Sequence, residues 1–141
     1  MKTYVLVVPF SMDLSRVALL QKQRRGPACV AEKLNFPGGK VEPGETPEAA
    51  AVRELKEEMA LEVDIAGLER IEFRSKAGDY ALYVYAARVP NFEAARTMTD
   101  EAVVVLTVDA LREGIRQLPE FYVADMLPVL ELALLTFPQF A

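Results

Sequence analysis

The chain has 141 residues, 52% of them hydrophobic and 26% charged, which predicts a folded domain with a buried core and excludes a disordered chain. Its formal net charge of −5 argues against binding nucleic-acid polymers through a basic surface, although a small anionic ligand in a local pocket remains compatible with it. A single cysteine, Cys29, and the lack of histidine exclude an intrachain disulfide framework, a zinc site built from several thiolates, and the commonest general base.

The first predicted elements form a β-hairpin. Residues 4–10, YVLVVPF, are a continuous apolar run typical of a strand covered on both faces, and residues 16–23, RVALLQKQ, form the expected second strand. A loop with a basic cluster follows. Residues 33–45, KLNFPGGKVEPGE, contain so many Gly and Pro residues that only short strands and tight turns fit there.

A helix is predicted from about Thr46 to Ala60. Thr46 is a good N-cap, and Pro47 suits the first helical position because the N–H that proline lacks would have no intrahelical partner there. The remaining predicted elements are a short strand at 61–65, a hairpin over 69–89 that turns at 76–79, a strand at 102–108, a helix at 109–118 and a second helix from about Tyr122. Together they predict a single mixed α/β domain over residues 1–141.

No targeting or membrane segment is expected. The N-terminal apolar run, MKTYVLVVPF, is too short for a signal peptide with its cleavage site. The apolar C-terminal stretch, VADMLPVLELALLTF, is interrupted by Asp125, Pro128 and Glu131 and is shorter than the roughly 20 residues of a membrane span. A soluble, cytoplasmic protein is therefore predicted.

Three carboxylates gather on one side of the predicted helix. With about 100° between successive residues, Glu54, Glu57 and Glu58 share an arc of about 100°. The helix gains nothing from this, because like charges four residues apart and acids in its C-terminal half are both unfavourable. Two interpretations follow from the helix alone: a solvated acidic face, or a site for a hard cation such as Mg²⁺ or Mn²⁺, which takes oxygen ligands.

The loop before the helix favours the cation site. Gly38 and Gly39 let the backbone turn where a side chain would obstruct, and Glu45 can meet Arg53 two turns up the helix. Here the sequence resembles the Nudix (MutT-like) hydrolases, whose box is G-x5-E-x7-R-E-U-x-E-E-x-G-U, with U a bulky aliphatic residue. Eight of the nine defined positions match over 23 residues, namely Gly39, Glu45, Arg53, Glu54, Leu55, Glu57, Glu58 and Leu61. Ala60 replaces the last Gly of the box, and it is expected either to continue the helix or to cap it with some strain.

The resemblance implies a Nudix-type fold, an α/β/α sandwich with a mixed central sheet, and hydrolysis of a nucleoside diphosphate linked to another moiety. The implied ligands of Mg²⁺ or Mn²⁺ are three carboxylates and one carbonyl, from Glu54, Glu57, Glu58 and Gly39. Arg53, which belongs to the catalytic motif, and Glu45 are implied to be structural and to keep the loop and the helix in register. Because the chain has no histidine, a carboxylate must accept the proton of the attacking water, and Glu54 or Glu57 is the candidate.

Outside the box the predictions are weaker. Many family members place an acid just before the strand at 102–108, so Glu101 is either a further metal ligand or base, or an exposed turn acid. Arg24 and Arg25 could contact the outer phosphates of the substrate or could be ordinary solvated bases, and Lys40 is similarly ambiguous.

Asn35 and Phe36 are the candidates for nucleobase recognition. The amide of Asn35 carries both a donor and an acceptor and suits a base edge, while the ring of Phe36 could stack on the base or fill the core. The order of Asn35, the glycine pair, the box, Glu101 and residues 119–120 is similar to the oxidised-purine nucleoside triphosphatases of the family. Those proteins usually have Trp near the last position, and this chain has no Trp.

Three functions follow from the resemblance. The leading prediction is a nucleoside triphosphate pyrophosphohydrolase that releases a monophosphate and pyrophosphate. The alternatives are a Nudix hydrolase of ADP-ribose, a nucleotide sugar or a dinucleotide, and a non-hydrolytic nucleotide sensor, although sensors typically lose the glutamates of the box. The expected partner is a small nucleoside di- or triphosphate, with no nucleic-acid polymer and no membrane, and a homodimer is left open.

Overall fold

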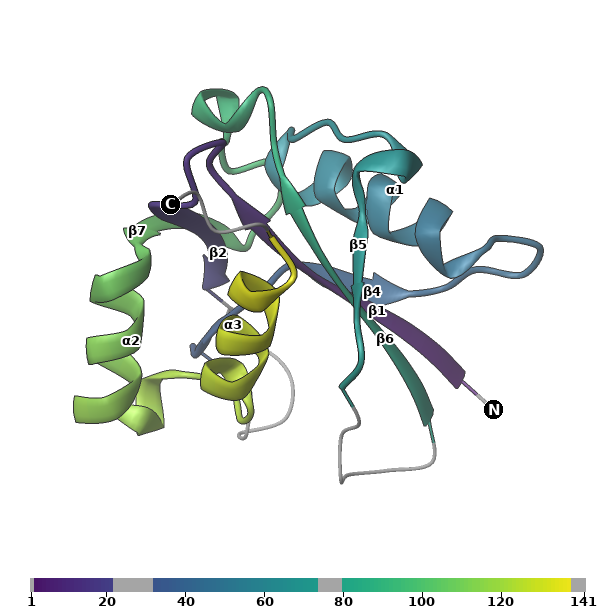
Figure 1. Ribbon diagram of the computed structural model, residues 1–141. Helices are drawn as coiled ribbons and strands as arrows, with labels where there is room; N and C mark the ends of the chain where they lie inside the picture. Colours follow the sequence, from purple (N-terminus) through teal and green to yellow (C-terminus); the bar gives the residue numbers. More distant parts are fainter. Residues whose placement is uncertain (1, 22–31, 74–79, 138–141) are drawn as a thin grey trace.

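A computed structural model describes residues 2–21, 32–73 and 80–137. The strands are β1 (Lys2–Phe10), β2 (Arg16–Gln21), β3 (Leu34–Asn35), β4 (Gly38–Lys40), β5 (Glu69–Ile71), β6 (Tyr80–Arg88) and β7 (Ala102–Thr107). The helices are α1 (Pro47–Met59), α2 (Val108–Gln117) and α3 (Met126–Leu135), and three 3-10 turns are η1 (Ile65–Gly67), η2 (Phe92–Ala94) and η3 (Pro119–Phe121). Figure 1 shows α1 on one side of the sheet and α2 and α3 on the other, which confirms the predicted α/β/α sandwich.

The sheet is mixed, and β1 lies at its centre. The strand order is β3-β2-β1-β6-β5, with β4 paired to β1 and β7 paired to β2. β1 and β6 run parallel along their whole length, and the other pairs are antiparallel. The predicted hairpin of β1 and β2 is present, but these strands pair only at Phe10 and Val17. β4 pairs with the N-terminal half of β1 instead, so the glycine pair lies inside the sheet region and beside its central strand.

The two faces of the sheet bury two separate apolar clusters. On β1, Val5 and Val7 face α1, whereas Val8 and Phe10 belong to the cluster under α2 and α3. Successive side chains of a strand point to opposite faces, so a continuous apolar run can supply both clusters at once. This explains why residues 4–10 show no alternation of polar and apolar residues.

The ends of α1 follow from local signals. The Oγ1 of Thr46 accepts the N–H of Ala49 at 3.1 Å, as expected of an N-cap. At the other end Ala60 adopts the left-handed conformation with φ 61°, and the N–H of Leu61 reaches the carbonyl of Leu55 at 3.3 Å. Ala60 therefore caps the helix in the way a glycine would, at a cost of about 1 kcal/mol for its Cβ.

Three predicted boundaries need correction. The strand predicted at 61–65 is wrong: Leu61 is buried directly after the helix, the segment pairs with no strand in the described ranges, and the 3-10 turn η1 follows. β7 ends at Thr107, one residue early, because the Oγ1 of Thr107 accepts the N–H of Ala110 and starts α2. The C-terminal helix starts at Met126 and not near Tyr122.

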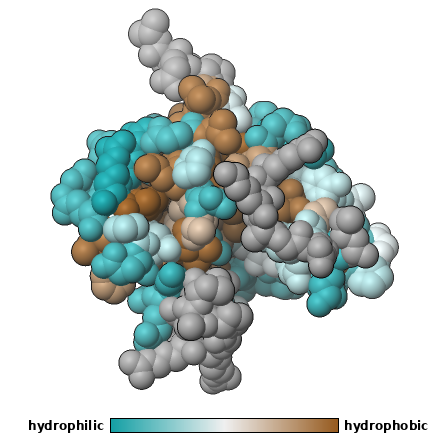
Figure 2. Space-filling model, turned by 90° about the horizontal axis from the view of Figure 1, so that it is seen from below, coloured by the Kyte–Doolittle hydropathy of each residue, from teal (hydrophilic) through white to brown (hydrophobic). Residues whose placement is uncertain are grey.

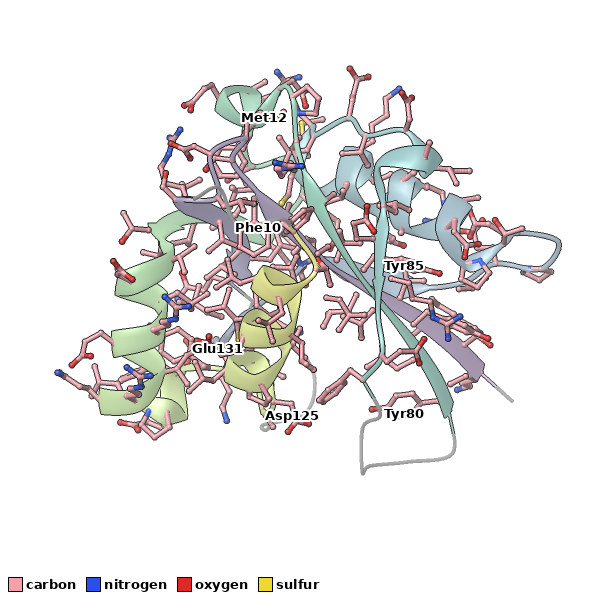
Figure 3. All side chains as sticks on the ribbon, in the orientation of Figure 1. Phe10, Met12, Tyr80, Tyr85, Asp125 and Glu131 are labelled. Atoms are coloured by element: carbon pink, nitrogen blue, oxygen red, sulfur yellow. The ribbon has the colours of Figure 1, made fainter. Side chains whose placement is uncertain are left out.

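The two C-terminal helices are joined by an ion pair. Arg112 of α2 donates from Nε to Oε1 of Glu131 on α3 at 2.6 Å and from a second nitrogen to Oε2 at 3.1 Å. Figure 3 shows Glu131 on the side of α3 that faces α2. In the parts of the chain described here, no helix combines the length and the apolar composition that crossing a membrane requires.

Candidate active site

The acidic side of α1 lies against the outer edge of β4. A Cβ added to Gly39 would lie 2.5 Å from Oε1 of Glu54, so this position has no room for a side chain while the carboxylate stays in place. The N–H of Gly38 donates to Oε1 of Glu58 at 3.0 Å, and Glu58 is only 8% exposed. The glycine pair and the acidic helix are therefore in direct contact.

Arg53 is the centre of an ion-pair network in this region. Its Nε and Nη2 donate to the two carboxylate oxygens of Glu45 at 2.8 and 3.0 Å, which is the contact predicted from the sequence. Its Nη1 donates to Glu54 at 2.8 Å and to Glu57 at 3.2 Å, and Nη2 also reaches the carbonyl of Lys40 at 3.1 Å. A single guanidinium thus links the loop, the strand and two of the three predicted metal ligands.

Within this network the pair of Glu45 and Arg53 stays charged over a wide pH range. The hydrogen bonds from Arg53, followed by the backbone N–H of Glu42, lower the pKa of Glu45 from its usual 4.5 to about 2. Glu45, more than any other group, raises the pKa of Arg53 above its usual value. Because the folded pKa of Glu45 is depressed, the stabilisation from this pair is present above pH 4.5 and is lost as the pH falls towards 2.

Arg53→Ala is expected to lower both the melting temperature, by about 5–10 °C, and the activity. The substitution leaves three carboxylates near one another without their counter-charge. The double variant Glu45→Gln/Arg53→Ala should recover part of the lost stability, because fewer unpaired charges then remain. Thermal unfolding of the two single variants and the double variant measures this, and a double variant that loses the full sum of the single effects would contradict it.

The donor set suits a hard divalent cation. The carboxylates of Glu54, Glu57 and Glu58 supply oxygen atoms, and the close approach of Glu54 to Gly39 brings the backbone of β4 within reach of them. Within the ranges that the structure describes, no three acidic side chains converge closely enough to hold an ion. The carboxylates of Glu54 and Glu57 are directed to Arg53 instead, so cation binding at this edge requires them to turn from the guanidinium.

The strand register bears on which glycine carbonyl can serve as a ligand. The N–H of Val7 donates to the Pro37 carbonyl, and the N–H of Val41 donates to the Thr3 carbonyl. Hydrogen-bonded pairs alternate along an antiparallel ladder, and the pair of Gly39 with Val5 lies midway between these two. The N–H and the carbonyl of Gly39 therefore face β1. Those of Gly38 face outward, where its N–H meets Glu58. The carbonyl next to the carboxylates is therefore that of Gly38, one residue before the predicted Gly39.

The remaining predicted charged residues lie on other segments of the chain. Glu101 lies directly before β7, and its backbone N–H donates to Oγ1 of Thr99 at 3.1 Å. Its role as a metal ligand or base stays a prediction. Arg24 and Arg25 lie outside the described residues.

A cleft of about 610 Å³ opens on the opposite face of the sheet, between β1, β4, β6 and α3. Its lining is mostly apolar and comprises Tyr4, Val5, Leu6, Asn35, Phe36, Gly38, Gly39, Phe73, Tyr80, Leu82, Val123, Ala124, Asp125, Met126 and Val129. Figure 2 looks at the molecule from the side of α3's first turn and shows hydrophobic residues gathered at the centre of this face. A cleft of this size and polarity suits a planar ring system.

The structure separates the roles of the two predicted base-binding residues. Asn35 lines the cleft, and its Oδ1 accepts the N–H of Phe36 at 2.8 Å, while its amide nitrogen has no hydrogen-bond partner among the described residues. Phe36 is 1% exposed and belongs to the core cluster under α3. Its ring forms part of the wall, and the prediction that it stacks on a base is not supported by this burial. Lys40 is exposed and pairs with Tyr4, so its side chain lies on the cleft side of β4.

Asp125 is the cleft residue that the sequence analysis missed. It is exposed, has φ 70°, and directly precedes α3, but its side chain makes no capping hydrogen bond to that helix. Figure 3 shows Asp125 and Tyr80 at the same end of the molecule, where the two line the cleft. The only sequence signal was an Asp before an apolar helix, which normally predicts an N-cap and no ligand contact.

Known proteins resemble the chain in sequence and in fold. The model of the NUDIX domain matches residues 2–130. Two curated relatives are named 8-oxo-dGTP diphosphatase. The one from Escherichia coli (strain K12) is 59% identical over 39 residues, which is 28% of this chain and 30% of that protein. The one from Haemophilus influenzae is 45% identical over 56 residues, 39% of this chain and 41% of that protein. Each match thus spans less than half of the relative.

Solved structures share the fold over a larger part of the chain. A MutT structure from a study of Aliivibrio salmonicida and Vibrio cholerae has a TM-score of 0.66 at 21% identity, and the match covers 79% of this chain and 84% of that one. A MutT/nudix family protein from Enterococcus faecalis has a TM-score of 0.59 at 20% identity and covers 75% and 43%. At these identities the likeness shows a common fold.

Proposed function

The chain belongs to the NUDIX domain family, and on this premise we propose that it is a hydrolase that cleaves the diphosphate linkage of a nucleoside triphosphate to give a monophosphate and pyrophosphate. The proposal treats residues 1–141 as a single domain. The cleft supports a nucleotide as the substrate, and the acidic edge of α1 supports hydrolysis as the reaction.

One observation carries the proposal: the same two glycines border both regions. Gly38 and Gly39 line the apolar cleft, and they also contact Glu58 and Glu54 at the outer edge of β4. A base held in the cleft can therefore direct its phosphates past β4 to the carboxylates of α1. Lys40, the next residue on the cleft side, offers a positive charge along this path.

Mg²⁺ or Mn²⁺ is the proposed cofactor, held by Glu54, Glu57, Glu58 and the carbonyl of Gly38. When bound it would neutralise phosphate oxygens and acidify a water molecule. Glu54 or Glu57 would take the proton of the attacking water, since both carboxylates lie at this edge and the chain has no histidine. Arg53, anchored by Glu45, would keep the carboxylates oriented.

The cleft favours a base that presents hydrogen-bond donors. An ionised Asp125 can only accept hydrogen bonds, so it suits the ring N–H and amino groups of a guanine-type base, while Asn35 adds donors. The two curated relatives named 8-oxo-dGTP diphosphatase make 8-oxo-dGTP the first substrate to test. This nucleotide is proposed as the substrate ahead of ADP-ribose and nucleotide sugars.

Asp125→Ala is expected to lower kcat/KM for the guanine-type triphosphate by about tenfold or more, mainly through KM, because donors of the base lose their acceptor. Steady-state kinetics with 8-oxo-dGTP and dTTP measures the change, which should be smaller for dTTP. Glu120→Ala is the matched control, since Glu120 is an exposed acid of η3 that does not line the cleft. Equal losses with both nucleotides would remove Asp125 from base recognition.

The function itself is tested with a panel of nucleotides in the presence of Mg²⁺. The panel contains 8-oxo-dGTP, the four standard deoxynucleoside triphosphates, ADP-ribose and a nucleotide sugar. Release of pyrophosphate and a monophosphate from triphosphates supports the proposal. Turnover of ADP-ribose alone would replace it with the second activity, and binding without turnover would replace it with nucleotide sensing.

A further inference from the structure

A buried tyrosine hydroxyl joins the sheet to the first turn of α1. Tyr85 of β6 is 2% exposed, and its hydroxyl donates to Oε1 of Glu48 at 2.9 Å. Glu48 is the second residue of α1, and its carboxylate is only partly exposed. Burial, and then this hydrogen bond, raise the pKa of Tyr85, so the phenol stays protonated and remains a donor. Figure 3 shows Tyr85 between the sheet and α1.

This contact differs from the other polar links between α1 and the sheet. Among the described residues, the links to β4 come from Arg53 to the Lys40 carbonyl and from the Gly38 N–H to Glu58. Both use residues of the proposed active site, whose side chains must adjust when a cation and a substrate bind. The link from Tyr85 to Glu48 lies outside the active site and can persist throughout the reaction.

The apolar contacts of α1 do not fix its orientation to the same degree. Near Glu48 the buried side of α1 consists of two alanines, Ala50 and Ala51, which bring the first turns close to the sheet but offer little shape to interlock, whereas the larger Leu55 and Met59 are buried further along the helix. Apolar burial is non-directional, so this end of the helix can shift at low cost unless a polar contact holds it. A rotation of about 20° moves a side chain at the helix surface by about 2 Å. The distance between a bound metal ion and a ligand atom can depart from its ideal value by only about 0.2 Å.

We propose that Tyr85, acting through Glu48, is a positioning residue for the metal-binding carboxylates of α1. The inference rests on the proposed function, because it assumes that these carboxylates bind a divalent cation. Glu48 lies about 9 Å along the helix axis from Glu54 and about 15 Å from Glu58. Tyr85 therefore touches neither the cation nor the substrate, and it acts by holding the helix at one end.

The direct test is the binding of Mn²⁺ alone, measured by isothermal titration calorimetry. Tyr85→Phe keeps the ring in the core and removes only the hydroxyl, and it should weaken Mn²⁺ binding by about tenfold, as the loss of a supporting hydrogen bond does at metal sites. Glu48→Ala should weaken binding equally, and Tyr85→Phe/Glu48→Ala should add nothing further. Glu48→Gln keeps an acceptor oxygen and should bind Mn²⁺ like the wild type.

Tyr83→Phe is the matched control. Tyr83 lies two residues earlier on the same strand and the same face, its ring lies under the guanidinium of Arg70, and its hydroxyl has no part in the proposed contact. It should leave Mn²⁺ binding unchanged. In the hydrolysis assay, Tyr85→Phe should raise the Mg²⁺ concentration for half-maximal rate and leave the KM for nucleotide unchanged, because the cleft lies on the other face of the sheet.

The outcomes separate this inference from the proposed function. Wild-type affinity for Mn²⁺ in Tyr85→Phe, or additive losses in the double variant, would overturn the positioning role. If Tyr85→Phe does not fold, the comparison of Glu48→Ala with Glu48→Gln decides, and equal affinities in these two would overturn it as well. A wild-type protein that binds no Mn²⁺ and hydrolyses no nucleotide would overturn the proposed function.

Discussion

Glu57→Gln is expected to lower kcat by roughly 10²-fold or more while the fold is kept. The substitution preserves the size of the side chain but removes the charge that either binds the cation or accepts the proton of water. Glu57 is 58% exposed and shares Arg53 with Glu54 and Glu45, so the helix loses no essential contact. Steady-state kinetics at saturating Mg²⁺ and thermal unfolding measure the two effects separately.

Glu62→Gln is the control for this variant. The side chain of Glu62 is similarly exposed, at 67%, and its only ion pair among the described residues is a loose one with Lys56 at 3.7 Å. Glu62→Gln changes the net charge of the protein by the same amount as Glu57→Gln, but away from the carboxylate cluster. It should retain wild-type kcat. If Glu57→Gln and Glu62→Gln both turn over like the wild type, the reaction does not use this side of α1.

Removal of divalent cations is expected to abolish hydrolysis, with a loss of at least about 10³-fold. The polyphosphate of the substrate and the three carboxylates of α1 are all negatively charged, and Arg53 is the main positive charge beside them among the described residues. A cation is therefore needed to neutralise the phosphates. Activity should vanish with excess EDTA and return when Mg²⁺ or Mn²⁺ is added beyond the chelator. Full activity in EDTA would contradict the metal assignment.

The same experiment has a readout in stability. A cation at concentration c that binds only the folded protein raises the free energy of unfolding by RT ln(1 + c/Kd), so the melting temperature rises as the cation concentration exceeds Kd. Mn²⁺ should therefore raise the melting temperature of the wild type and raise that of Glu57→Gln less. An equal rise in both would place the cation elsewhere on the protein.

The acidic helix and its loop could be predicted because their signals are local. Thr46 and Pro47 identify the start of α1, and the spacing of Glu45 and Arg53 brings the two together across two helical turns. The strand predicted at 61–65 failed for the opposite reason. A strand needs a neighbour, and no pattern within a short apolar segment tells whether the fold supplies one.

The cleft could not be predicted because its parts come from distant segments. Asn35, Tyr80 and Asp125 meet only when β3, β6 and α3 are packed around β1. The burial of Phe36 has the same origin, since the cluster under α3 covers its ring. The contact of Tyr85 with Glu48 joins residues 37 positions apart, and neither residue belongs to the box.

The parallel pairing of β1 with β6 sets the order in which the protein can be assembled on the ribosome. This pairing joins Lys2 with Tyr80, 78 positions later. β1 is synthesised first, and it cannot pair with β6 until more than half of the chain has been made. Contacts this distant in sequence form slowly. α1 is synthesised in this interval, before the strand that carries Tyr85 exists. A nascent chain that stops before β6 would contain every residue of the acidic helix and would still lack Tyr85 and the part of the surface under α1 that β6 supplies.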